Sequence, residues 1–169
     1  MKSRHKNQKG FTLIELLVAL PLVAIVTFAA STVAIQTMQS SRTTNHMVAL
    51  GQVQNAGNWI SQDAIQAQQV TVLTSPGFLS LEWTNWDNSD TYKVDYSLIA
   101  SGDLNYLERK EIVNGDTSNP IIMIVSRYID DSTECAWDSI QDTLTVEVTA
   151  RVGEQLETRL YEIKPRPLI

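Results

Sequence analysis

Cysteine and histidine are scarce in this sequence. Its 169 residues include one cysteine, Cys135, and two histidines, His5 and His46. A single cysteine excludes a disulfide within the chain, so we expect Cys135 to be a small, partly buried residue. The two histidines leave no His-based triad and no histidine metal cluster for the rest of the chain. Because a glycine-rich phosphate loop is missing too, we expect neither an enzyme nor a cofactor.

Basic residues are few after position 10. Residues 1–10 hold four Lys or Arg and no acid, and the remainder has nine basic residues against 19 acidic ones, a net charge of −10. Binding to a nucleic-acid backbone relies on Lys and Arg, so we expect no direct contact with nucleic acid. An acidic body of this kind suits a soluble surface outside the cell.

The one long apolar run lies directly after the basic start. Residues 11–35 read FTLIELLVALPLVAIVTFAASTVAI, in which Glu15 is the only charge. From Leu16 to Ile35 there are 20 uncharged residues, about 30 Å of helix and enough for one bilayer crossing. By the positive-inside rule the N-terminus stays in the cytoplasm and the chain beyond about residue 36 lies outside.

Three interpretations of this segment compete. A secretory signal has its small-residue cleavage site after the apolar run, for which Thr27-Phe28-Ala29 is a weak candidate. A signal anchor tolerates the length but has no use for Glu15. A charge costs about 2.5–3.5 kcal/mol at the centre of a membrane span and less near its edge, so Glu15 requires a reason.

The third interpretation rests on a motif. Residues 9–18, KGFTLIELLV, closely resemble the prepilin peptidase site of type IV pilins and pseudopilins. The resemblance implies that leader 1–10 is removed by the prepilin peptidase, which also acts as N-methyltransferase, after Gly10. Phe11 then becomes the methylated N-terminus and Glu15 the fifth mature residue. Further partners implied are other pilin or pseudopilin subunits and the cytoplasmic membrane.

A cut after Gly10 also has a physical consequence. It creates an amine at Phe11, four residues from Glu15, on the same helix face and about 6 Å away along the axis. A carboxylate in hydrocarbon needs such a partner, and the resemblance implies that a neighbouring subunit's amine supplies it. Leader removal also deletes the four basic residues that hold the N-terminus at the cytoplasmic face.

Pro21 lies within the expected span. It cannot donate to the Leu17 carbonyl, so it should kink or loosen the helix. It is either a tolerated membrane proline or, as the resemblance implies, a point where the helix extends during packing.

Helical character continues beyond the membrane. Three- and four-residue spacing places one apolar face along the helix, made by Leu50, Val53, Gly57, Ile60, Ala64 and Ala67. We expect one helix over about 11–69, roughly 90 Å long, of which half protrudes and half packs on a globular part. Residues 52–64 loosely resemble the corresponding helix of minor pilins and J-type pseudopilins.

After Pro76-Gly77 the pattern changes to strands. We expect strands at 78–84, 91–100, 104–113, 121–129 and 143–152, with 156–163 returning as a hairpin partner after Gly153-Glu154. Leu144, Val146, Val148 and Ala150 alternate with polar residues, which predicts one wet face. The run IIMIV at 121–125 predicts a central buried strand. The fold class is therefore α+β and pilin-like, with a long N-terminal helix packed on an antiparallel sheet.

One loop is distinctive. Residues 83–90, WTNWDNSD, include the hard oxygen ligands Asp87, Asn88 and Asp90, which are weak calcium candidates. Their spacing matches no calcium motif, and an ordinary turn, with Trp83 and Trp86 as packing residues, is the simpler interpretation.

The expected organisation is a leader (1–10), a transmembrane and filament-core helix (11–35), its amphipathic continuation (36–69) and a β-rich globular part (70–169). The expected function is a non-enzymatic subunit, minor or priming, of a type IV pilus or a type II secretion-like filament. The subunit is held by a single pass in the inner membrane before it joins a periplasmic or cell-surface filament. The alternative is an anchored extracytoplasmic binding or sensor module that does not polymerise.

Overall fold

A computed structural model describes residues 12–166 of the chain. The chain divides into two compact units, one extending to Ser41 and the other beginning at Arg42. We describe each unit by itself and call residues 42–166 the head. Gly10 and Phe11, the residues of the expected cleavage site, lie outside the described residues.

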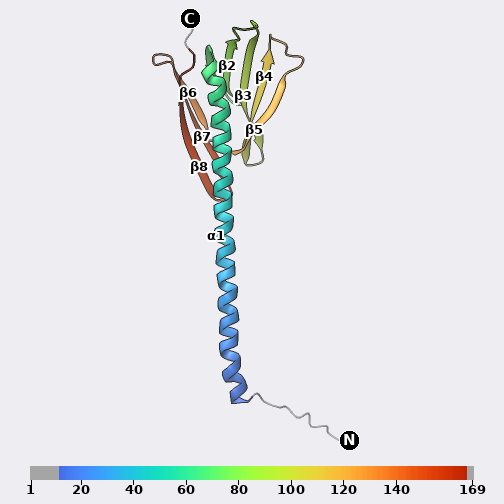
Figure 1. The fold of residues 1–169 in the computed structure, drawn as a ribbon, viewed down its shortest axis with the longest axis vertical. Helices are drawn as coiled ribbons and strands as arrows, with labels where there is room; N and C mark the ends of the chain where they lie inside the picture. The colour runs from blue at the N-terminus through green and yellow to red at the C-terminus, as the bar shows by residue number, and fades with distance from the viewer. Residues whose placement is uncertain (1–11, 167–169) are drawn as a thin grey trace. The chain divides into compact units, whose positions relative to one another are not determined.

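One helix, α1, runs from Leu13 to Gln66 and contributes to both units (Figure 1). The sequence predicted a helix over about 11–69, and the structure ends it three residues earlier. The reason is a competing hydrogen bond: the Gln68 amide donates to the Glu82 carbonyl at 2.9 Å. Gln69 then pairs with Glu82 as the first residue of a strand. The chain therefore adopts strand conformation here and does not continue the helix.

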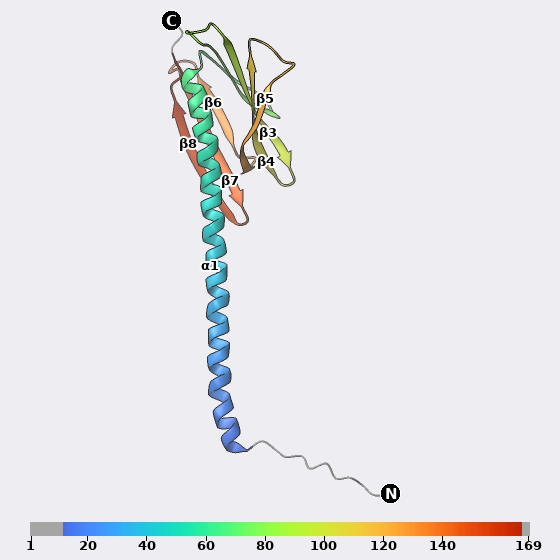
Figure 2. The ribbon, with the colours of Figure 1, turned by 45° about the vertical axis from the view of Figure 1, so that its right-hand side comes forward.

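The head contains eight strands in one antiparallel sheet (Figures 1 and 2). Their order is β1-β2-β3-β4-β5-β7-β6, and β8 pairs with β7. The bounds are β1 Gln69–Val72, β2 Gly77–Thr84, β3 Thr91–Ser101, β4 Leu104–Val113, β5 Ile121–Ile129, β6 Glu134–Asp138, β7 Thr143–Val152 and β8 Gln155–Ile163. The predicted α+β class, with a long helix packed on an antiparallel sheet, is confirmed. The sequence missed β1 and β6.

The core of the head forms between one face of α1 and the inner face of the sheet. Val53, Gly57, Ile60 and Ala64 are buried as the helical spacing predicted, and Ala67 is buried just beyond the helix. Val53, Ile60, Ala64 and Ala67 pack in one cluster with Leu79, Leu81, Val94, Tyr96, Leu107, Leu144, Val146, Val148 and Ala150. The predicted alternation along β7 is therefore confirmed. The exception on its outer face is Thr149, which is buried because it bonds to Thr133 and Thr158.

The prediction of a central buried strand at 121–125 is wrong. β5 pairs with β4 along most of its length, but with β7 only at Ile129. Ile121, Ile122 and Ile124 are exposed at 59%, 55% and 43%. An apolar run becomes a buried strand only when both of its edges and both of its faces are covered, and the pairing of β5 does not provide this.

Tyr161 of the last strand lies directly against α1 at Gly57. A methyl group at this position would overlap the ring of Tyr161, whose hydroxyl donates to the Val53 carbonyl at 3.1 Å. Gly57→Ala should therefore lower the free energy of unfolding by about 1–3 kcal/mol, because the ring must move and lose its hydrogen bond. Denaturant unfolding of the full chain in detergent, followed by circular dichroism, measures this.

Gly51 supplies the matched control, since a methyl group there meets nothing within 4 Å. Gly51→Ala should raise stability by about 0.5–1 kcal/mol through helix propensity alone. In a Tyr161→Ala background the cost of Gly57→Ala should disappear. Equal effects of the two glycine substitutions in the native background would contradict the close approach.

Candidate functional site

The N-terminal segment begins α1 with a reciprocal pair of hydrogen bonds. Thr12 precedes the helix, and its hydroxyl accepts from the Glu15 amide at 3.4 Å. The Glu15 carboxylate in turn accepts from the Thr12 amide at 3.3 Å and the Thr12 hydroxyl at 3.2 Å. This arrangement is a capping box, which satisfies backbone donors that the first helical turn leaves unpaired. It also places a negative charge at the positive end of the helix dipole.

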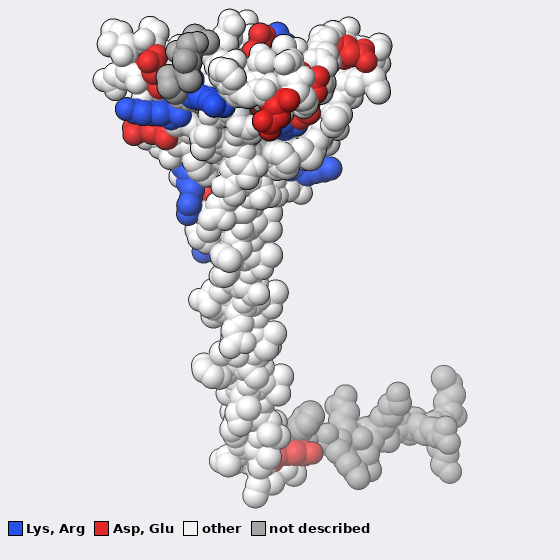
Figure 3. All heavy atoms as spheres, turned by 45° about the horizontal axis from the view of Figure 1, so that its top comes forward, with Lys and Arg blue, Asp and Glu red and all other residues white. Residues whose placement is uncertain are grey.

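The polar side chains farther along this segment bond to their own helix. The hydroxyl groups of Thr27, Ser31, Thr32 and Thr37 each donate to a carbonyl three or four residues earlier. A helix facing hydrocarbon must satisfy its polar groups internally, and these bonds do so. Glu15 is the only charged residue from position 12 to position 41. Figure 3 shows the same contrast, with charged side chains gathered over the strands and few along the first part of the helix.

This segment also meets the requirements of a membrane span. Most of its large apolar side chains are more than half exposed, and α1 contains a stretch that is long and apolar enough to cross a bilayer. Pro21 lies inside α1, which continues through it without an interruption in its helical assignment. The proposed kink at Pro21 stays a prediction.

A buried ionic cluster joins α1 to the sheet, and no pattern in the sequence predicted it. Asp63 on α1 accepts two hydrogen bonds from Arg109 on β4, from Nε at 2.7 Å and from Nη2 at 3.0 Å. The Tyr96 hydroxyl donates to the same carboxylate, and Glu111 accepts from Arg109 Nη1 at 2.7 Å. The guanidinium also lies over the Trp59 ring, 5.4 Å from its centroid.

The charges of this cluster are fixed by their surroundings. Burial and the nearby Asp63 carboxylate raise the pKa of Tyr96, so its hydroxyl remains a donor. Burial alone would lower the pKa of Arg109, but its hydrogen bonds to Asp63 and Glu111 outweigh this and raise it. The Tyr96 hydroxyl and the Arg109 guanidinium therefore keep their protons, and their roles as donors, at physiological pH. The cluster joins α1 to β4 through the paired Asp63 and Arg109 side chains.

The loop proposed for calcium is held by its own hydrogen bonds. Both Asp90 oxygens accept from side-chain amides, one from Asn88 and the other from Asn114. The Asn88 side-chain oxygen accepts from the Asp90 amide at 3.1 Å, and Asp87 donates its amide to Asn85. Among the described residues no group of three or more His, Cys, Asp or Glu is placed to hold a metal ion. Asp87, Asn88 and Asp90 stay weak calcium candidates, and an ordinary turn stays the simpler interpretation of this loop.

The two tryptophans of this region behave differently. Trp83 packs against the core and stacks on Tyr92, with ring centroids 5.6 Å apart. Trp86 is 61% exposed, and the Arg166 guanidinium lies 5.3 Å from its ring centroid. Packing is thus confirmed for Trp83, whereas Trp86 lies at the surface because its loop extends beyond the strands.

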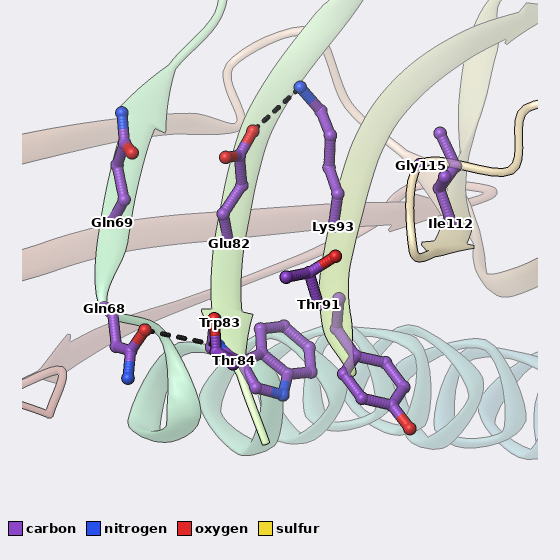
Figure 4. Close-up of a pocket in the computed structure, with 10 residues that line it drawn as sticks. Gln68, Gln69, Glu82, Trp83, Thr84, Thr91, Lys93, Ile112 and Gly115 are labelled. Carbon is purple, nitrogen blue, oxygen red and sulfur yellow. Dashed lines mark hydrogen bonds and ion pairs between the residues drawn. The ribbon is translucent and has the colours of Figure 1, made fainter. Parts of the chain in front are cut away.

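A surface hollow of about 360 Å³ lies beside the stacked pair (Figure 4). Its polar side chains are joined to one another: Lys93 to Glu82 at 2.9 Å, and Gln68 to the Thr84 amide at 3.2 Å. In Figure 4, Glu82 and Lys93 point to one side of the strands and Trp83 to the other. These pairings make the hollow a part of the sheet surface and supply no acid–base or nucleophilic arrangement among the residues drawn.

Cys135 is partly buried, as predicted. Its thiol donates to the Phe78 carbonyl at 3.2 Å. Burial, together with the nearby Glu134 charge, raises the pKa of Cys135 to about 11. The thiol is therefore protonated at neutral pH and slow to react with electrophiles.

The comparisons with known proteins bear on the N-terminal segment. The family model described as the prokaryotic N-terminal methylation motif matches residues 5–31. No curated protein matches the chain, and no solved structure matches it. The matched residues contain Glu15 and Pro21 and include the first turns of α1, whose residues Val53, Ala56, Ile60 and Ala64 pack in the core with the sheet. With this prepilin-type motif followed by a long apolar N-terminal helix, the chain matches a type IV pilin or pseudopilin.

Proposed function

We propose that the chain is a structural subunit of a type IV pilus or of a type II secretion-like filament. The observation that carries the proposal is the methylation motif at residues 5–31, which overlaps the exposed apolar first part of α1, where Glu15 is the only charge from position 12 to position 41. Prepilin peptidase removes residues 1–10, and Phe11 becomes the N-methylated N-terminus. The motif favours a structural role over an enzymatic one.

In this proposal α1 has two roles, one before and one after removal of the leader. In the precursor it anchors the chain in the cytoplasmic membrane by a single pass, with the basic leader inside and the head outside. After processing, the leader's four basic residues are gone and the same helix becomes filament core. Its self-bonded hydroxyl groups suit both settings, because neither offers water to an unsatisfied donor.

Glu15 is the assembly residue in this proposal. In the described structure its carboxylate accepts only weak, long hydrogen bonds from Thr12. The amine of a neighbouring Phe11 offers a charge-assisted bond, which is roughly twice as strong as a neutral one. Docking therefore satisfies a charge that the membrane leaves poorly paired.

Within the filament we favour a minor or priming position over the bulk subunit. The support is the loose similarity of residues 52–64 to minor pilins and J-type pseudopilins. The proposal does not extend to adhesion, motility, secretion or DNA uptake. Which of these processes the filament serves depends on the other proteins with which the subunit assembles.

Mass spectrometry of the protein isolated from membranes tests the proposal. We expect loss of residues 1–10 and one added methyl group on the amine of Phe11. A strain without prepilin peptidase is the control and should yield the full precursor. An intact leader in cells with an active peptidase would contradict the proposal and favour the anchored, non-polymerising module.

A further inference from the structure

A second surface hollow, of about 420 Å³, lies where the turn between β3 and β4 meets the end of β5. Its volume falls within the range of about 300–1,000 Å³ that small-molecule sites occupy. The residues that line it include Asp103, Leu104, Asn105, Tyr106, Arg127 and Tyr128. Two aromatic rings, a guanidinium, a carboxylate and an amide therefore border one hollow. The proposed function uses none of them.

A bulge in β5 presents two of these side chains. Between two of its pairs with β4, strand β5 has two residues where β4 has only one, Tyr106. The two residues are Arg127 and Tyr128, and both are exposed, whereas their neighbours Ser126 and Ile129 are buried. Bulges turn side chains out of the regular alternation of a strand and are common beside functional sites.

The bulge is fixed from inside the head. The Gln52 side-chain oxygen on α1 accepts from the Arg127 amide at 2.7 Å and from the Ser126 hydroxyl at 3.1 Å. Tyr128 has a φ of 60°, in the left-handed region that a bulky residue rarely adopts. Such a conformation persists only where the surrounding structure holds it, and it is concentrated at functional sites. The backbone of the hollow is therefore organised before any ligand binds.

The two charges of the hollow are opposite, and both are available to a ligand. Within residues 12–166 the Arg127 guanidinium forms no ion pair and the Asp103 carboxylate accepts no hydrogen bond. The Asn105 side chain donates to Asp131 at 2.7 Å and keeps its oxygen as an acceptor. The hollow thus offers the N–H donors of Arg127 together with the acceptors of Asp103 and Asn105, with no net charge among its lining side chains.

This combination fits a ring that carries hydroxyl groups at its edge and C–H groups on its faces, as a pyranose does. Its hydroxyl groups donate to Asp103 and Asn105 and accept from Arg127. Its C–H faces pack on the two tyrosine rings, which are apolar over most of their surface. We propose that the hollow between the β5 bulge and the β3–β4 turn binds a neutral pyranose.

Two other kinds of ligand fit less well. An anion would meet the Asp103 carboxylate and the acidic body of the chain, whose net charge after position 10 is −10. A protein partner anchors itself in fully desolvated apolar pockets, whereas Leu104 is the only aliphatic residue that lines this hollow and Tyr128 remains 46% exposed. The balanced charges and the exposed rings therefore favour the neutral sugar.

Saturation-transfer NMR of the full chain, in a detergent without a sugar headgroup, tests the proposal. The probes are the methyl glycosides of glucose, galactose, mannose and N-acetylglucosamine, each at about 10 mM, because an open site of this size implies millimolar affinity. At least one should receive saturation at its ring protons and bind no more weakly than methyl glucuronide. Binding of the glucuronide alone would overturn the neutral ligand, and no transfer to any of these glycosides would overturn the site.

Substitutions at Tyr128 separate binding from folding. Tyr128→Gly removes the ring but suits the positive φ, so it should lower the affinity about tenfold or more while the melting temperature stays the same or rises. Tyr128→Phe keeps the ring and should bind within about threefold of the wild type. Binding by Tyr128→Gly at the wild-type affinity would overturn the proposal.

Arg127→Gln tests the polar side of the hollow. It removes a charged donor and keeps the backbone amide that bonds to Gln52, so the affinity should fall about tenfold. The matched control is Trp86→Ala, which removes an exposed ring from another loop and should leave the affinity unchanged. Equal losses in Trp86→Ala and Tyr128→Gly would overturn the proposal, since sugars would then bind any exposed aromatic ring of the head.

Discussion

Replacing Glu15 by valine should leave removal of residues 1–10 intact and lower the recovery of the subunit in sheared filaments by about tenfold or more. An unpaired carboxylate costs up to about 2.5–3.5 kcal/mol in hydrocarbon, and about 1.4 kcal/mol corresponds to tenfold in an equilibrium. Valine removes both this cost and the attraction to a neighbour's amine, so docking loses its driving force. Quantitative immunoblotting of sheared and cell-bound fractions measures the ratio.

Glu15→Gln is the matched control, because glutamine preserves the capping box with Thr12 while removing the charge. It should assemble almost as poorly as the valine variant. If glutamine restored assembly, the role of Glu15 would lie in beginning the helix and not in docking. Undiminished incorporation of Glu15→Val would contradict any assembly role.

Replacing Arg109 by methionine should lower the melting temperature of the head by about 10 °C or more. The substitution leaves Asp63 buried with the Tyr96 hydroxyl as its remaining partner in the cluster. Removing one partner of a buried ion pair costs about 3–5 kcal/mol, and each kcal/mol shifts the melting temperature of a domain of this size by about 3–5 °C. Circular dichroism of the full chain in detergent measures the transition.

Two further variants serve as controls for the loss of stability expected of Arg109→Met. Asp63→Leu with Arg109→Met should recover most of the loss, because no unpaired charge remains in the interior. Lys93→Ala breaks the exposed pair with Glu82 and should cost less than about 1 kcal/mol. An Arg109→Met variant as stable as Lys93→Ala would show that the buried cluster does not hold the helix to the sheet.

The sequence predicted those parts of the molecule that depend on patterns of neighbouring residues. The methylation motif is one continuous segment, residues 5–31, and the strand at 143–152 alternates apolar and polar side chains along its own length. The apolar helix needs no partner to be recognised. Each of these features can be read without knowing which distant segment lies beside it.

What the sequence did not predict depends on distant partners. β1 and β6 are four and five residues long and contain Gln69, Glu134 and Asp138, so only their pairing with β2 and β7 makes them strands. The Asp63 cluster joins residues that are 33 and 46 positions apart. The error at 121–125 has the same origin, because burial of β5 depends on which edges the rest of the sheet covers.

The contact of Tyr161 with Gly57 has a consequence for the order in which the subunit is made. The helix is synthesised first, and the strand that covers it at Gly57 is the last one to be completed. A nascent chain that stops short of β8 presents Val53, Ala56 and Gly57 without the Tyr161 ring and lacks Ile163 from the core. The core around α1 is therefore complete only when the final strand has been synthesised.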